Sequence, residues 1–257
     1  MSVPAVPSDL VDRLRGAGCV FAEDEARLLV RTGATGEQLE ALVLRRVAGE
    51  PLETVLGWVE FAGRRLVVAP GVFVPRRRTE LLARVAASYA RPRSVLLELC
   101  CGVAPVAAVV AAGEVHASDV DPVALGCARR NVPHGHVHLS DLYDALPGVL
   151  RGRVDVLVAN APYVPTDRIA LMPPEARDHE PTAALDGGPD GVDLHRRIAA
   201  GAPDWLAPGG VLLVETSAAQ AILTTKAMRE AGLEPRVEHD DDLEGCVAVG
   251  VRPGEPG

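Results

Sequence analysis

The tetrapeptide Asn160-Ala161-Pro162-Tyr163 follows directly on an apolar run, and its residue types could hold a planar nitrogen group. Asparagine is poor in a strand interior, and the prolines that follow leave it no obvious capping role. Its side-chain carbonyl and the main-chain carbonyl of Ala161 are two acceptors, while Tyr163 adds an aromatic face. These groups could bind an amide or amino group through both N–H donors. The alternative is a polar turn with a core tyrosine.

Three further candidate residues follow other apolar runs. Gly102 lies in a turn before a helix, where glycine lets the backbone approach a ligand, although an ordinary strand-to-helix turn explains it as well. Asp119 comes about twenty residues later, where nucleotide-binding folds keep an acid for the ribose hydroxyls. It could instead cap the next helix, but Asp121 already stands beside Pro122 for that role. Asp141 could accept from an adenine amino group or be a solvated loop carboxylate.

The chain from residue 94 onward alternates apolar runs with helical stretches, which predicts a parallel sheet covered on both faces. The expected strands are 94–100, 114–120, 136–142, 154–160, 210–216 and 246–252. The expected helices are 105–112, 122–131, 192–206 and 218–231. The spacing of the first three strands fits right-handed β-α-β units. The sequence therefore predicts an α/β, doubly wound, Rossmann-like fold, which binds ligands beyond the carboxyl ends of its strands.

The amino-terminal part has a different pattern, because apolar residues such as Leu39 and Val43 recur with helical spacing. Two short extended runs around a glycine then predict a hairpin. We expect three parts: a small helical domain over 1–56, a β-hairpin linker over 57–73 and the α/β domain over 74–257.

The composition is that of an ordinary globular protein, with 48% hydrophobic and 24% charged residues among 257. A formal charge of -9 makes a long nucleic-acid groove improbable, since such grooves need clustered basic surface. The cysteines are odd in number and lack the spacing of a zinc site, which favours a reducing cytosol. The longest apolar run is too short to span a bilayer. We expect a cytoplasmic protein that binds a small molecule or a protein and no membrane.

With these residues in place, the chain resembles the HemK/PrmC-type protein N(5)-glutamine methyltransferases, which depend on S-adenosylmethionine and have the class I methyltransferase fold. The resemblance covers nearly the whole chain. It rests on residues 49–82 and 180–198, which are specific to this family, and on the stretches "SDVDPVAL", "NAPYVP" and "LAPGGVLLVETSAAQA".

The resemblance implies that Asn160 and the Ala161 carbonyl hold the substrate glutamine amide, with Pro162 and Tyr163 completing the catalytic set. It also implies a cofactor, S-adenosyl-L-methionine, and no metal. The implied cofactor-binding residues are Arg76, Thr79, Glu98, Cys100, Gly102, Asp119, Val120, Asp141, Leu142 and Asn160. Outside the family context, the basic triplet 76–78 would be a solvated face.

Three features differ from the family pattern. Cys100 and Ala104 stand in place of two of the three glycines in the first turn, and Ala161 replaces the first proline of Asn-Pro-Pro-Tyr. Ala161 keeps its carbonyl, and Pro162 still favours extended geometry at the residue before it. The helical region, which in the family helps to select the protein substrate, is expected to be shorter than usual.

The implied reaction is methyl transfer to a glutamine side chain of a protein, such as a peptide chain release factor. Because an amide nitrogen is a poor nucleophile, the enzyme would act by positioning and electrostatics. No strong general base is expected, and the motif places no histidine near the tetrapeptide.

Two other functions share some of these features. One is a methyltransferase for an amino group of a nucleic-acid base, which the negative charge disfavours. The other is a catalytically degenerate protein that binds S-adenosylmethionine or a partner, which the replaced glycines suggest. A dehydrogenase is more distant, because the first turn lacks Gly-x-Gly-x-x-Gly.

Overall fold

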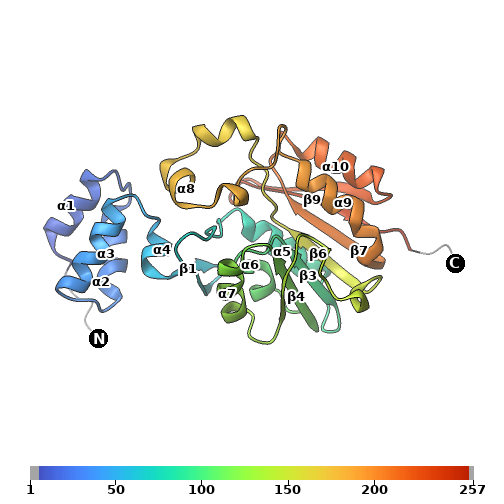
Figure 1. The fold of residues 1–257 in the computed structure, drawn as a ribbon, viewed down its shortest axis with the longest axis horizontal. Coiled ribbons are helices and arrows are strands. Elements are labelled where there is room, and N and C mark those ends of the chain that lie inside the picture. The colour runs from blue at the N-terminus through green and yellow to red at the C-terminus, as the bar shows by residue number, and fades with distance from the viewer. Residues whose placement is uncertain (1–5, 255–257) are drawn as a thin grey trace.

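The computed structural model describes residues 6–254, and its central feature is a seven-stranded sheet (Figure 1). In spatial order the strands are β5 (His136–Leu139), β4 (Glu114–Asp119), β3 (Val95–Leu99), β6 (Val154–Ala159), β7 (Leu206–Glu215), β9 (Gly245–Val251) and β8 (Glu234–Asp240). The first five of these run parallel, and β9 is antiparallel to both of its neighbours. The predicted doubly wound, mostly parallel α/β fold is confirmed.

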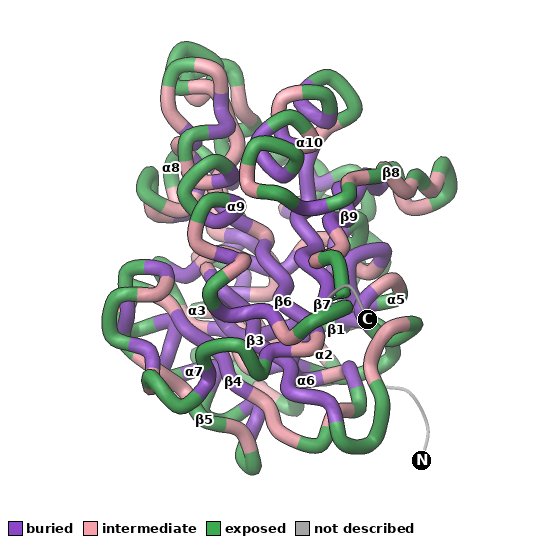
Figure 2. Tube along the Cα trace, turned by 90° about the vertical axis from the view of Figure 1, so that its right-hand side faces the viewer, coloured by how far each residue is buried: buried purple, intermediate pink, exposed green. Residues whose placement is uncertain are grey.

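Helices cover both faces of this sheet. One face carries α5 (Thr79–Tyr89), α6 (Pro105–Val109) and α7 (Pro122–Asn131), and the other carries α9 (Asp193–Trp205) and α10 (Ala221–Glu230). Because side chains alternate along a strand, Leu96 packs in the first apolar layer and Leu97 in the second. The central strands are therefore buried on both sides, as their purple colour in Figure 2 shows.

All six predicted strands are present, and the helices differ only at their ends. The strand β7 begins at Leu206 rather than at residue 210, α6 ends at Val109 rather than at 112, and α10 begins at Ala221 rather than at 218. The strand β8 was not predicted. Its sequence, EPRVEHD, is polar because this strand lies at the sheet edge with most of its residues exposed or half-buried.

The amino-terminal helices have an apolar core of their own. Helices α1 (Ser8–Gly16), α2 (Ala22–Arg31), α3 (Glu37–Val47) and α4 (Leu52–Leu56) bury Leu14, Leu29 and Val43 among themselves. In Figure 1 the first three form a group beside the sheet domain, joined to it through α4 and β1.

The predicted hairpin is present as β1 (Trp58–Phe61) paired with β2 (Arg64–Val67). Phe61 and Leu66 pack in the layer of α5 to α7, so the hairpin rests on the sheet domain. The functional division at residues 56 and 73 stays a prediction.

The long connection between β6 and α9 contains α8 (Pro174–His179) and two short 3-10 segments, Thr166–Leu171 and Thr182–Ala184. In the described range 6–254, no helix is both long and apolar enough to cross a membrane.

Candidate functional site

A cavity of about 600 Å³ opens at the carboxyl ends of β3, β4 and β6, where a doubly wound fold binds its ligands. The site residues predicted from the sequence, with the exception of Thr79, line this one cavity: Arg76, Glu98, Cys100, Gly102, Asp119, Val120, Asp141, Leu142, Asn160, Ala161, Pro162 and Tyr163. Residues from five separate stretches of the chain thus meet in one place. Their roles stay predictions.

The turn after β3 keeps a glycine-type backbone although two of its residues are not glycine. Cys100, Gly102 and Ala104 have φ angles of 48°, 53° and 61°. A side chain in this left-handed region costs about 1–2 kcal/mol, because Cβ crowds the following carbonyl oxygen. Cys100 and Ala104, which stand in place of glycines, therefore keep the left-handed backbone of the turn at the cost of local strain.

Glu98 lies beneath this turn and is almost fully buried. Its carboxylate oxygens accept hydrogen bonds from the main-chain N–H groups of Val106 and Ala107, at 3.3 and 2.6 Å. Burial raises the pKa of Glu98 to about 8, although the two N–H donors oppose the rise. The group links the end of β3 to the start of α6 and also faces the cavity.

Asp121 caps the following helix, as predicted, and Asp119 is left to face the cavity. The side chain of Asp121 caps α7 by accepting from the N–H of Val123 at 2.8 Å. The oxygens of Asp119 accept from the N–H groups of Gly102 and Asp121, at 2.8 and 2.9 Å. Burial raises the pKa of Asp119, and these N–H donors oppose the rise. Each oxygen keeps a lone pair that a ligand hydroxyl could use.

Asp141 lies at the rim of the cavity. It lines the cavity, and its half-exposed carboxylate also pairs with Arg197 at 3.0 Å. The guanidinium holds the carboxylate at the rim.

Asn160 is oriented by a residue behind it. Its amide nitrogen Nδ2 donates to the hydroxyl of Thr79 at 3.3 Å. Thr79 is fully buried at the start of α5 and was predicted to contact the cofactor; it lies instead behind Asn160. Because Nδ2 is turned to Thr79, the side-chain carbonyl is the part of the Asn160 amide left for the cavity.

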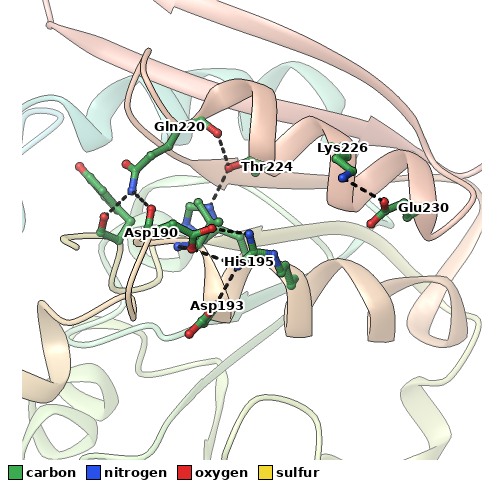
Figure 3. A network of polar contacts seen from close by, with 10 residues as sticks. Asp190, Asp193, His195, Gln220, Thr224, Lys226 and Glu230 are labelled. Atoms are coloured by element: carbon green, nitrogen blue, oxygen red, sulfur yellow. Dashed lines mark hydrogen bonds and ion pairs between the residues drawn. The ribbon is translucent and has the colours of Figure 1, made fainter. Parts of the chain in front are cut away.

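Tyr163 is held through both its hydroxyl and its main chain. The hydroxyl donates to Oε1 of Glu215 at 3.2 Å, and the guanidinium of Arg78 lies 5.7 Å from the ring centre. Burial raises the pKa of Tyr163, and the neighbouring Glu215 raises it further. The Tyr163 carbonyl accepts from Nε2 of Gln220 at 2.8 Å, and the same amide also reaches the carbonyl of Asp190, as Figure 3 shows.

The sequence patterns did not indicate Glu215, Gln220 or His195. Glu215 ends β7 next to β6, so the rule that ligands meet strand ends could have singled it out.

The side chain of His195 is fully buried, with Nδ1 at 2.9 Å from the hydroxyl of Thr224 (Figure 3). A histidine therefore does lie near the tetrapeptide, with its ring centre 6.2 Å from that of Tyr163. Burial lowers the pKa of His195 to about 4, so it is neutral.

One wall of the cavity comes from the connection between β6 and α9, which is tied down at two points. Glu175 pairs with Arg46 of α3, and the buried Glu180 pairs with Arg76 at 2.7 Å. Arg76, which would have been a solvated residue outside the family context, thus fixes a segment whose Met172 lines the cavity.

No group of three or more metal-ligating side chains is present among residues 6–254.

Curated proteins named release factor glutamine methyltransferase are similar to the chain. The protein from Geobacter sulfurreducens is 38% identical over 185 residues, covering 70% of this chain and 65% of that protein. The protein from Streptomyces coelicolor is 40% identical over 184 residues, covering 68% and 65%. The protein from Deinococcus radiodurans is 34% identical over 248 residues, covering 91% and 88%. The chain thus spans slightly under two thirds of the first two relatives and most of the third. No protein-family model matches it.

Solved structures of methyltransferases share the fold. A methyltransferase from Pyrococcus furiosus has a TM-score of 0.56 at 16% identity, covering 83% of this chain and 98% of that one. A ribosomal protein L11 methylase from Lactobacillus delbrueckii subsp. bulgaricus has a TM-score of 0.52 at 12% identity, covering 73% and 84%. At these identities the likeness concerns the fold alone.

Proposed function

The chain belongs to the release factor glutamine methyltransferase family, and we propose that it transfers a methyl group from S-adenosylmethionine to the side-chain amide nitrogen of a glutamine in a release factor. The observation that carries this proposal is the pair of carbonyl groups of Asn160 and Ala161 at the end of β6. Both residues line the same cavity as Asp119.

The cavity fits a nucleoside that carries an amino-acid chain. Its volume of about 600 Å³ is within the usual range for small-molecule sites. Asp119 would accept from the ribose hydroxyls and Asp141 from the adenine amino group, while Val120 and Leu142 would contact the base. The turn at Gly102 would lie against the methionine part. When bound, S-adenosylmethionine supplies a methyl group on a positively charged sulfur, and the electron pair of the broken carbon–sulfur bond stays on sulfur.

The chain's own contribution to the reaction is to orient the acceptor. The two carbonyl oxygens of Asn160 and Ala161 would each accept one N–H of the glutamine amide, and Tyr163 would pack beside it. These hydrogen bonds raise electron density on the nitrogen as its lone pair forms the new bond to carbon. One amide proton then leaves to solvent. His195 takes no part, since its side chain is fully buried and its lowered pKa makes it a weak base.

The helical region over 1–56 and the hairpin over 57–73 are proposed to select the protein substrate, with 74–257 as the catalytic domain. The separate apolar core of the helices supports this division. We place the reaction in the cytoplasm, where release factors act in translation.

The test is incubation of the full chain with methyl-labelled S-adenosylmethionine and a purified release factor, followed by mass spectrometry of the modified residue. Label on a glutamine side chain supports the proposal. The matched control is the same factor with that glutamine replaced by glutamate, which should take up no label. Label on nucleic acid offered in its place would contradict the proposal in favour of an amino-group methyltransferase.

A degenerate relative is distinguished by its ligand binding. A ligand at 100 times its dissociation constant stabilises a protein by about 2.7 kcal/mol, so S-adenosylhomocysteine should raise the melting temperature clearly. No rise, together with no transfer, would favour a protein without cofactor.

A further inference from the structure

Glu215 is a buried carboxylate that touches the predicted amide site from behind. It ends β7, next to the strand that carries Asn160, and only 1% of its side chain is exposed. Its Oε1 accepts from the hydroxyl of Tyr163 at 3.2 Å and from Nε of Arg78 at 3.3 Å. Burial raises the pKa of Glu215, and Thr79, Arg78 and Tyr163 oppose the rise. Burying a charged carboxylate is unfavourable unless it is well paired. Glu215 therefore depends on these partners.

The second oxygen of this carboxylate still lacks a donor. Oε2 of Glu215 is buried and has no hydrogen-bond partner among the residues described. The hydroxyl of Thr79 is the neighbouring group that interacts with the Glu215 carboxyl, and it already accepts from Nδ2 of Asn160. Its own proton is therefore free to turn to the carboxylate.

With Glu215 ionised, these three groups allow only one direction of hydrogen bonding. The ion pair with Arg78 favours this ionised form, which can accept but not donate, so Thr79 donates its single proton to it. The Thr79 oxygen can then only accept from Asn160. An accepting oxygen selects the NH₂ end of the Asn160 amide and repels the carbonyl end.

We propose that Glu215, acting through Thr79, is a positioning residue that fixes the Asn160 amide with its carbonyl oxygen toward the cavity. The inference rests on the proposed function for its catalytic meaning, because only a carbonyl in that position accepts an N–H of a glutamine amide. With the asparagine amide turned over, two NH₂ groups would face each other and binding would fail.

The chain offers a direct test, because asparagine occurs at positions 131 and 160 only. Selective ¹⁵N labelling of asparagine gives two pairs of side-chain NH₂ signals in NMR spectra, one pair for each residue. Asn131 is an internal reference, since its Nδ2 donates to the carbonyls of Val67 and Val103, at 3.0 and 2.9 Å, far from Thr79 in sequence and contacts.

The variants are Thr79→Val, which keeps the shape and loses the hydroxyl, and Thr79→Ser, which keeps the hydroxyl. Thr79→Val should shift the Asn160 amide signals and speed their exchange with solvent, while the Asn131 signals stay in place. Thr79→Ser should restore the wild-type Asn160 signals. Ser94→Ala removes another buried hydroxyl at the amino end of β3 and should move neither the Asn160 signals nor the kinetics.

In kinetics, Thr79→Val should lower kcat by about tenfold or more, with the affinity for S-adenosylhomocysteine changed by less than about twofold. Thr79→Ser should recover most of this loss. If Thr79→Val does not fold, Glu215→Gln takes its place and should change the Asn160 signals in the same way. A glutamine side chain can also donate to Thr79, so the direction of the hydrogen bond between Thr79 and Asn160 is no longer fixed.

Unchanged Asn160 signals in a folded Thr79→Val or Glu215→Gln variant would overturn the relay. If instead the signals respond as expected but the wild-type chain methylates no glutamine, the relay stands and the proposed function fails. The two ideas are thus tested separately.

Discussion

Two turns of this protein face the same cavity, and they differ in which groups they offer to a ligand. The turn after β3 offers main-chain groups to a ligand, and its shape survives although Cys100 and Ala104 hold left-handed backbone angles. The turn after β6 offers side chains, and Asn160 and Tyr163 keep their orientation through contacts with Thr79 and Glu215. The first turn tolerates a change of residue type as long as its backbone is kept. The second depends on side chains from other elements, the helix α5 and the neighbouring strand β7.

The largest effect is expected in the second turn. Asn160→Ala should lower kcat by more than about 100-fold, because a preorganised acceptor in the transition state is lost. Affinity for S-adenosylhomocysteine should stay nearly the same, as measured by calorimetry. A variant with most of its turnover intact would show that the Asn160 carbonyl does not hold the substrate amide.

A smaller effect is expected beside the first turn. Asp119→Ala should weaken binding of S-adenosylhomocysteine by about tenfold or more, because hydrogen bonds to a charged group are lost. The control is Asp121→Ala, which removes the cap of α7 and should cost about 1 kcal/mol of stability with far less effect on affinity. Equal affinities of wild type and Asp119→Ala in calorimetry would remove the aspartate from the site.

The pH dependence of stability tests the support beneath the first turn. The folded pKa of Glu98 is raised from 4.5 to about 8, so its stabilising contribution is present below about pH 4.5 and is lost as the pH rises toward 8. Glu98→Gln removes this loss. Between pH 4.5 and 8, chemical unfolding should show the variant gaining at least about 1 kcal/mol relative to wild type. Parallel pH profiles of the two proteins would contradict the raised pKa.

The smallest effect concerns the strained backbone itself. Ala104→Gly should stabilise the fold by about 0.5–1 kcal/mol, since relief of the left-handed alanine exceeds the loss of one methyl group. Ala108→Gly lies within α6 and should instead destabilise by about 1 kcal/mol or more. Opposite signs in thermal unfolding would separate strain relief from a general effect of glycine, whereas two destabilised variants would mean that the turn is relaxed.

The fold could be predicted well because parallel strands that are buried on both faces have continuous apolar sequences. The strand β8 escaped because an edge strand with polar residues has no such signal. The site could be predicted where a residue ends a strand or follows it directly, as Asp119 and Asn160 do. Glu215 likewise ends β7 but was not singled out, since its importance comes from side chains of distant segments that turn toward it.

The helical region and the cavity wall share one cation. Arg46 is buried in α3, where it pairs with Glu25 of its own region and with Glu175 of the segment that walls the cavity. A shortened chain that began at the hairpin would lose this arginine together with the helices. The amino-terminal region therefore helps to hold the segment that forms one wall of the cavity, and removing it should change the shape of that wall.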